Sequence, residues 1–523
     1  MSSKTPKEKT RSKDALVDAM ARRAKRGHGK RAPVVERFVR DFFANVSPKD
    51  CSEADPEALA GAVQSAWAHV QTRKAGAAKV RVFNLDPEKD DWNVGHTIVE
   101  IVNDDMPFLV DSVTAELNRR NLTVHLVIHP IMAVVRTRAG KLSDVLDAAE
   151  PPDGQRESIM HIQVTEQADP AALKELRGGI LRVLGDVRTA VEDWRPMRVC
   201  LADAIAGLDT TAGLVQREEI SETADFLRWL EANNFTFLGY REYAIGTSGK
   251  KQKLKVVRKS GLGLLRDKTV VAIEGMEDGA VLPPDLAEIL QRPSLTLINK
   301  GSRRSTVHRG VHLDAIMIKQ FDESGRTVGQ RLFVGLFTST VYNQPVETIP
   351  VIRKKARRVI ERSGFSSVSH DGKALTHILE TLPRDELFQI GERELSDMAM
   401  GILHLQERQK VALFTRHDPF GRYVSCLVYV PRDRYDTRLR RRIHDVLETG
   451  FAGTVTAFYT QLSDEVPARL HFIVKTGDRE RKAKPLSEIE AEVIETARDW
   501  ADDLAQALSD DHGESEGLSL FDR

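Results

Sequence analysis

The sequence predicts an α+β protein built from small ferredoxin-like sandwiches, with extra helices at the N-terminal side. Residues 97–202 and 424–500 carry this prediction, because both stretches show the order strand, helix, strand, strand, helix. The length agrees with it, since a chain of 523 residues exceeds a single core and should form two to four domains. Such a repeat favours an array of small domains over one catalytic unit.

The first unit has the clearest pattern. Residues 98–102 form a β-branched run typical of a strand, and residues 124–128 alternate as a second strand. The residues between them predict a helix that ends near Asn121. Its apolar side recurs at helical spacing, at Met106, Val110, Val113 and Leu117.

The start of this helix is expected in an acidic turn. Asp104 or Asp105 can cap it with a side-chain oxygen, and Pro107 suits its first turn. Ser112 and Glu116 are expected on the side that faces away from the apolar residues.

The rest of the unit follows in sequence. Residues 138–141 predict a turn, residues 159–165 a strand and residues 170–194 a long amphipathic helix. A last strand at residues 198–202 would complete the βαββαβ order of a ferredoxin-like sandwich.

The N-terminal residues differ in composition. Residues 1–32 are rich in basic residues, Ser and Gly, and they predict a solvated, disordered tail; binding to nucleic acid or an acidic partner is the alternative. Two helices are expected at residues 34–43 and 56–71, and a strand at residues 79–85 then leads into the first unit.

A strand-rich region follows, whose topology the pattern does not predict. Helices are expected at residues 222–233, 350–363 and 373–382. Strands are expected at residues 235–243, 254–258, 295–299, 311–321 and 331–338.

The last region repeats the first without obvious sequence identity. Its strands are expected at residues 424–430, 454–459 and 469–474, and its helices at residues 439–450 and from Ile489 onward. The predicted domains are residues 33–205, 206–400 and 401–523.

Composition narrows the function classes. The chain has 77 basic and 77 acidic residues, and this zero net charge argues against a nucleic-acid or membrane surface spread over the molecule. No apolar run approaches the roughly 20 residues of a membrane span, and the basic N-terminus lacks the apolar core of a signal peptide. Three cysteines far apart, Cys51, Cys200 and Cys426, imply no disulfide framework. We therefore expect a cytoplasmic protein without a membrane partner.

Motifs for cofactors and metals are weak. Residues 261–266, GLGLLR, lack the third glycine of a dinucleotide-binding turn, and no phosphate-binding GxxxxGK[ST] loop occurs. His125 and His129 are predicted on a strand, where four residues span roughly 13 Å, too far for one ion. The residues thus predict no catalytic, cofactor-binding or metal site.

Two further segments contain clusters of charged side chains. Residues 300–309 concentrate cations and hydroxyls in an expected loop that could bind an anion or form interdomain salt bridges. The residues considered for the anion are Lys300, Arg303, Arg304, His308 and Arg309. Residues 383–389, PRDELFQ, mix acids with an arginine, and the simplest interpretation is a helix start, with Asp385 and Glu386 favouring the positive end of the dipole.

The acidic turn before the first helix is the best candidate ligand site. Free N–H groups at a helix start attract carboxylates, while neighbouring aspartates attract an amino group, and an amino acid carries both charges. The candidate effector-binding residues are Asn103, Asp104, Asp105, Met106, Pro107, Phe108, Leu109, Asp111 and Ser112. The alternative is that the same residues only cap the helix.

Several motifs together resemble one family. They are NDDMPFLVDS at residues 103–112, FTFLGY at 235–240, STVHR at 305–309, PRDELFQ at 383–389 and RYVSCLVYVPRDRY at 422–435. This combination resembles the N-terminal part of the large bacterial NAD-dependent glutamate dehydrogenases, from about Val35 to the end of the chain.

The resemblance implies three consecutive ACT-like domains, a βαββαβ fold that commonly senses amino acids. It implies that the dehydrogenase core, which converts glutamate to 2-oxoglutarate with NAD, lies downstream and is missing here, so the chain alone is expected to be inactive. No cofactor is therefore expected in this chain. The implied partners are further copies of the chain, the downstream core and a small amino-acid effector.

Two other readings of the sequence stay open. A purely architectural module would self-associate and bind no effector. An RNA-binding protein is disfavoured, because residues 450–458 are only a loose match to the aromatic sheet motif and the net charge is zero.

Overall fold

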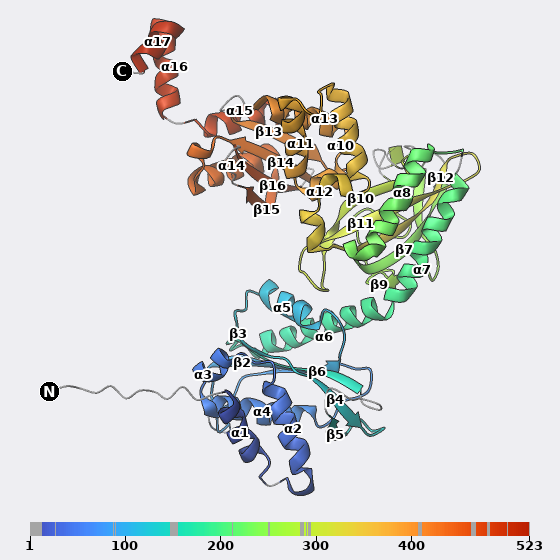
Figure 1. Ribbon diagram of the computed structural model, residues 1–523, viewed down its shortest axis with the longest axis vertical. Coiled ribbons are helices and arrows are strands. Elements are labelled where there is room, and N and C mark those ends of the chain that lie inside the picture. The colour runs from blue at the N-terminus through green and yellow to red at the C-terminus, as the bar shows by residue number, and fades with distance from the viewer. Residues whose placement is uncertain are drawn as a thin grey trace, which may run out of the picture.

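The structure is a computed structural model of the chain. It describes residues 13–521 apart from residues 27, 87, 89, 147–154, 212, 249–250, 283–286, 289, 291–293, 406–409, 462–466, 478–481 and 499. Three antiparallel sheets follow one another along these residues, and helices cover them (Figure 1). The predicted α+β class is confirmed. Residues 1–12 of the expected tail lie outside the described residues.

The first sheet has the order β1-β2-β6-β4-β5, and β3 pairs with β6 beside β4. Its strands are β1 Lys79–Phe83, β2 His96–Asp104, β3 Val124–Ile128, β4 Ile131–Arg136, β5 Leu142–Leu146 and β6 Gln155–Thr165. β3 and β4 pair with successive stretches of β6, and Pro130, which cannot donate to the ladder, lies between them.

The predicted strand-helix-strand-strand-helix order is present, but the fourth strand is elsewhere. Helices α5 (Leu109–Arg119) and α6 (Pro170–Glu192) pack on one face of the sheet. The predicted strand at residues 198–202 is wrong, because these residues belong to helix α7 (Trp194–Ala206), whose buried side chains follow helical spacing. The position beside β2 is filled by β1, which precedes the unit in sequence.

Four helices cover the other face of the first sheet. They are α1 Lys13–Ala24, α2 Ala32–Phe43, α3 Pro48–Glu53 and α4 Pro56–Val70. The expected tail is therefore wrong for residues 13–24, since α1 buries Leu16, Val17 and Met20 against this core. Its apolar stripe is narrow and stands among basic residues, which explains why composition concealed it.

The middle sheet has the order β10-β11-β12-β7-β8, with β9 beside β7. Its strands are β7 Phe235–Ser248, β8 Lys251–Val256, β9 Leu262–Gly263, β10 Thr296–Arg304, β11 His312–Phe321 and β12 Thr327–Phe337. β12 pairs with β7, so this sheet does not have the strand order of the first one. A third ACT-like unit in the middle of the chain is not confirmed.

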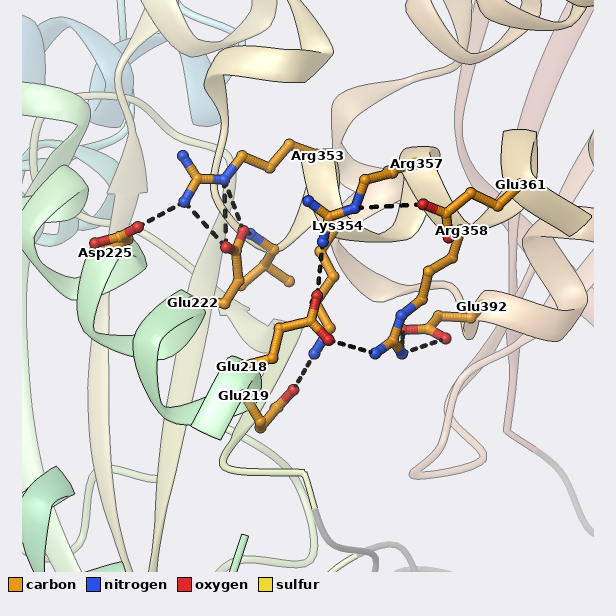
Figure 2. Close-up of polar contacts among 11 residues, drawn as sticks. Glu218, Glu219, Glu222, Asp225, Arg353, Lys354, Arg357, Arg358, Glu361 and Glu392 are labelled. Carbon is orange, nitrogen blue, oxygen red and sulfur yellow. Dashed lines mark hydrogen bonds and ion pairs between the residues drawn. The ribbon is translucent and has the colours of Figure 1, made fainter. Parts of the chain in front are cut away.

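One group of helices packs against the middle sheet; the first of them precedes this sheet in the chain, and the rest lie between it and the last sheet. They are α8 Arg217–Trp229, α10 Ile352–Ser363, α11 His370–Thr381, α12 Arg384–Gln389 and α13 Glu392–Leu405. They share one core with the middle sheet, to which Leu427 and Tyr429 of the last sheet also belong. Figure 2 shows that acidic side chains of α8 face basic side chains of α10 across this junction.

The last sheet repeats the arrangement of the first. Its strands are β13 Ala412–His417, β14 Tyr423–Val430, β15 Gly453–Gln461 and β16 Ala468–Thr476, in the order β13-β14-β16-β15. Helices α14 (Thr437–Gly450) and α15 (Leu486–Thr496) cover one face. Here again the edge strand beside the first strand of the unit precedes the unit, so both terminal sandwiches depart from the expected βαββαβ order in the same way.

The long helix α6 runs from the first sandwich toward the middle sheet and continues into α7 (Figure 1). One apolar core contains side chains of α5, α6 and the middle sheet. The three sheets are thus joined by packing and not only by the chain. Among the described residues, no helix is both long and apolar enough to span a bilayer. Helices α16 (Trp500–His512) and α17 (Glu514–Phe521) end the described chain.

Candidate functional site

The acidic turn does not cap α5 as predicted. Asp104 is the last residue of β2, and its carboxylate accepts hydrogen bonds from Arg73 and, at 2.6 Å, from Arg188 of α6. Burial alone would raise the pKa of Asp104, but the hydrogen bonds from the two arginines outweigh it and lower the pKa. Asn103 accepts from the same Arg188. The carboxylate of Asp104 is therefore already bound by arginines of the protein itself.

Arg73 connects Asp104 to a second buried carboxylate. Its Nε donates to Glu157 Oε1 at 2.9 Å, and Arg136 donates to both oxygens of Glu157 at 2.7 Å. The side chains of Arg73 and Glu157 are fully buried. Such a network is stable only because every charge has partners, and removing one arginine would leave a carboxylate buried and unpaired.

Helix α5 begins without a side-chain cap. The preceding residue, Phe108, has a φ of 72°, and its side chain makes no capping hydrogen bond. In the described part of the chain, the backbone N–H groups of residues 109–111 have no hydrogen-bond acceptor. This helix start therefore keeps the free donors that a carboxylate would need.

The loop at residues 305–309 lies against this helix start. The backbone N–H of His308 donates to Ser112 Oγ at 2.8 Å, and His308 Nδ1 lies 2.9 Å from Asp111 Oδ2. The His308 ring also contacts the ring of Phe108, with 5.1 Å between centroids. The two candidate ligand-binding segments of the sequence thus meet at the junction of the first and middle domains. Ser112 is buried, contrary to its predicted exposed position.

Some of the other residues of the turn pack in the core, and others are partly or fully exposed. Leu109 is buried in the core beneath α5, and Met106 packs at the edge of that core. Pro107 is exposed and precedes the helix instead of lying in its first turn. Asp105 donates its backbone N–H to the carbonyl of Arg156, at 2.9 Å. Of the two aspartates expected to attract an amino group, only Asp105 makes no ion pair among the described residues.

The predicted anion-binding cations do not gather at one point. Lys300 is half-buried, with its Nζ 2.6 Å from Asp314 and 3.0 Å from Asp385. Arg309 donates to the carbonyl of Phe337, and Arg304 donates to that of Gly310. Arg303 and Arg304 border a small enclosed cavity of about 20 Å³, too small for a metabolite. Lys300 instead pairs with carboxylates of β11 and α12, both within the middle part of the chain.

The PRDELFQ segment forms helix α12, as predicted, and its two acids bind different domains. Asp385 reaches Lys300 of β10 and accepts a hydrogen bond from Tyr342 at 3.2 Å. Glu386 points to the last sheet, where it accepts from Arg416 at 2.7 Å and lies 3.6 Å from His471. The helix-start interpretation misses this role, because sequence spacing gives no sign of partners 30 residues or more away.

The GLGLLR segment binds a carboxylate of the chain itself, through Gly263 and Arg266. The N–H of Gly263 donates to Asp193 Oδ2 at 2.7 Å, and Arg266 donates to both oxygens of Asp193. Gly263 has a φ of 56°, and a Cβ there would lie 2.2 Å from the carbonyl oxygen of Leu238. This loop therefore fastens the α6–α7 junction to the middle sheet.

The two histidines on and after β3 point to different neighbours. The ring of His125 stacks on His96, with 4.0 Å between centroids, and His129 Nε2 lies 2.7 Å from Ser158 Oγ. Among the described residues, no group of three or more His, Cys, Asp or Glu side chains could hold a metal ion.

Sequence comparisons match these structural units. Residues 38–180 match the glutamate dehydrogenase ACT1 domain, residues 412–501 the ACT2 domain, and residues 349–408 glutamate dehydrogenase helical motif 1. The two ACT matches cover the first and last sandwiches, and the helical motif covers α10 to α13.

Relatives match almost the whole chain. It is 38% identical over 495 residues to the NAD-specific glutamate dehydrogenase of Halomonas elongata, which covers 94% of this chain and 31% of that protein. The protein of the same name from Pseudomonas aeruginosa is 36% identical over 493 residues, 94% of this chain and 30% of that protein. The one from Mycobacterium tuberculosis is 28% identical over 451 residues, 84% of this chain and 26% of that protein. The chain thus spans about a third of the length of the first two of these relatives. It belongs to the NAD-specific glutamate dehydrogenase family and carries ACT domains of that family.

Proposed function

We propose that this chain is the regulatory and oligomerising segment of an NAD-specific glutamate dehydrogenase in the cytoplasm, and that a small amino acid is its effector. The reaction of the whole enzyme, from glutamate, NAD and water to 2-oxoglutarate, ammonium and NADH, belongs in this proposal to a dehydrogenase core outside these residues. The observation that carries the proposal is the junction of the uncapped start of α5 with the loop at residues 305–309.

The chemistry of this junction suits a zwitterion. The free N–H groups of residues 109–111 favour the carboxylate of an amino acid. Asp111, whose side chain is 58% exposed, and Asp105 favour its amino group. A ligand at this position would contact two domains at once, so its binding energy could shift their relative arrangement and the assembly of the enzyme.

Calorimetric titration of the 523-residue chain with the twenty amino acids tests the effector. We expect heat from at least one of them, and loss of that heat in Asp111→Ala. Asp371→Ala is the matched control, because Asp371 is an exposed acid in the first turn of another helix, α11. Absence of heat with every amino acid, under conditions where the chain is folded, would refute effector binding.

The second candidate function is self-association without an effector. The edge strand β15 supports it, because among the described residues β15 pairs only with β16 and exposes Phe458 and Tyr459. Light scattering with and without amino acids separates the two functions. An assembly whose mass is the same in every amino acid, together with silent calorimetry, favours the architectural module.

RNA binding has weaker support. Phe458 and Tyr459 are neighbours on β15, so their rings point to opposite faces of the sheet. Phe458 lies beneath Arg440 of α14, with 4.3 Å from the guanidinium carbon to the ring centroid. The two aromatic rings therefore cannot form one stacking platform for bases.

A further inference from the structure

A large open cavity in the first domain is lined by basic side chains. It has a volume of about 1140 Å³ and lies between the loop that joins α4 to β1 and the turn that joins β4 to β5. This volume is slightly above the usual range of small-molecule sites, about 300–1,000 Å³, so a metabolite fits in it. We call it the cationic cavity.

Backbone hydrogen bonds hold the two walls of the cationic cavity together. The N–H of Arg73 donates to the carbonyl of Gly140, and the N–H of Leu142 donates to that of Gln71, both at 2.9 Å. Gly140 has a φ of 79°, and a Cβ there would lie 2.1 Å from the Arg73 carbonyl oxygen. The walls are thus preformed, which lowers the entropy cost of binding a ligand.

Cations outnumber carboxylates around the cationic cavity. Seven lining residues are basic, namely Arg73, Lys74, Lys79, Arg81, Arg136, Arg138 and Arg177, and no described lining residue is acidic. Three carboxylates behind the wall pair with some of these cations, namely Glu100, Asp104 and Glu157. The excess of positive charge favours an anion that carries more than one negative charge.

Four of the cations have no carboxylate partner among the described residues. Lys79 Nζ donates to two carbonyls and a hydroxyl, and burial together with the charges of Arg81 and Arg136 lowers its pKa. Arg177 uses only its Nε, on the carbonyl of Val80 at 2.9 Å. Lys74 and Arg138 are exposed and make no ion pair in the described part of the chain. The three donors of the Lys79 ammonium are thus taken by the protein, whereas the charges of Arg177, Lys74 and Arg138 remain available to a ligand.

We propose that the cationic cavity binds a small organic molecule that carries a phosphate or pyrophosphate group, separate from the proposed amino-acid effector. Ammonium and guanidinium groups are the side chains that hold phosphate oxygens. The rest of the lining is mostly alanine and valine, which suits an apolar portion of the same molecule. The chain has zero net charge, which favours a compact ligand in this cavity over a nucleic-acid strand.

Calorimetric titrations at physiological salt test the site with three probes: inorganic pyrophosphate, ADP and a single-stranded RNA. We expect both phosphate probes to bind, with ADP the tighter of the two. The double variant Lys74→Ala/Arg138→Ala should weaken both by about tenfold or more, because it removes two unpaired cations. Both side chains are exposed, so the fold should be kept, which circular dichroism checks.

The matched control is Arg362→Ala/Lys373→Ala, which removes two exposed cations of α10 and α11. It should bind the probes like the unaltered chain. The proposal is overturned if neither phosphate probe binds, if both double variants weaken binding equally, or if RNA binds and ADP does not. Equal affinity for pyrophosphate and ADP would overturn the assignment of an apolar portion.

Discussion

The contact of Glu386 with Arg416 shows how strongly one buried charge depends on another. Burial would raise the pKa of Glu386, but Arg416 and His471 hold it well below its usual value. Both side chains of the pair are at most 4% exposed. We therefore expect Arg416→Met to lower the free energy of unfolding by about 3–5 kcal/mol, because it leaves a buried, unpaired carboxylate.

Urea unfolding followed by circular dichroism measures this loss. The double variant Glu386→Leu/Arg416→Met should lose less than Arg416→Met alone, since it removes both charges. If the double variant loses more than the single one, the pair stabilises the domain junction by packing and not by compensating charge.

Asp314 gives a prediction about pH. Burial, with a contribution from the nearby Asp385, raises its pKa to about 6 despite its contact with Lys300. In the unfolded chain the pKa of an aspartate is about 3.9. Between about pH 4 and pH 6, the Asp314 carboxyl is therefore protonated in the folded state and ionised in the unfolded state. The stabilising contribution of Asp314 is therefore fully present below about pH 4 and is lost as the pH rises through 6. In urea titrations from pH 4.5 to 8, the unfolding free energy of the unaltered chain minus that of Asp314→Asn should fall up to about pH 6–7 and then level off. A difference that is constant with pH would contradict the raised pKa.

Single residues also mark the limit of prediction from sequence. The sequence marks both the turn at residues 103–112 and the loop at residues 300–309 as candidate binding segments, but it does not predict that they are in contact. The sequence offers Asp104 as one of two possible helix caps, whereas in the structure Arg188, 84 residues away, donates to its carboxylate. Local spacing predicts caps and periodic faces, while partners at such separations are set by tertiary packing, for which one sequence has no signal.

Prediction of helices and strands from the sequence meets the same limit. Most strands and helices were predicted, because their apolar residues follow a period of 2 or 3.6. The prediction places the edge strand of the first sandwich at residues 198–202 and omits β13 of the last one, since any strand of suitable length can pair with β2 or β14 and local patterns do not select one. The middle sheet was not predictable, because β7 and β12 pair across nearly 100 residues of chain.

Helices α8 and α10 give a prediction about salt. Arg353 binds Glu222 and Asp225 of α8, and its side chain and that of Glu222 are 35% and 13% exposed (Figure 2). We expect Arg353→Ala to cost about 1–2 kcal/mol of unfolding free energy at low salt. The cost should shrink in 1 M NaCl, because salt screens half-exposed charges.

Arg228→Ala is the matched control for this measurement. Arg228 also reaches Asp225, at 3.5 Å, but this pair is 62% and 42% exposed, so its loss should cost less than about 0.5 kcal/mol. Equal costs for the two variants, or a cost for Arg353→Ala that does not change with salt, would mean that packing and not charge joins the helices.

The three sheets form one packed unit, because apolar cores and polar contacts extend across the junction of the first and middle sheets and across that of the middle and last sheets. One apolar core includes α5, α6 and the middle sheet, and another includes the middle sheet and residues of β14. Asn299 of β10 donates to Asp418 beside the last sheet at 2.9 Å, and Arg422 donates to the carbonyl of Lys300. A ligand in the first domain could therefore affect the third through packed, hydrogen-bonded elements.

The α6–α7 junction is where this coupling can be tested. Asp193 is 6% exposed and accepts from Gly263 and Arg266, so Asp193→Ala leaves a buried N–H and a guanidinium without their acceptor. We expect hydrogen exchange of residues 262–272 to become at least about tenfold faster, and exchange in β14 and β16 to stay unchanged. Glu192→Ala is the control, because Glu192 is 54% exposed and reaches Arg266 only at 4.0 Å. If the two variants exchange alike, α6 is held to the middle sheet by its apolar face alone. Faster exchange in the last sheet would instead mean that the whole molecule opens as one unit.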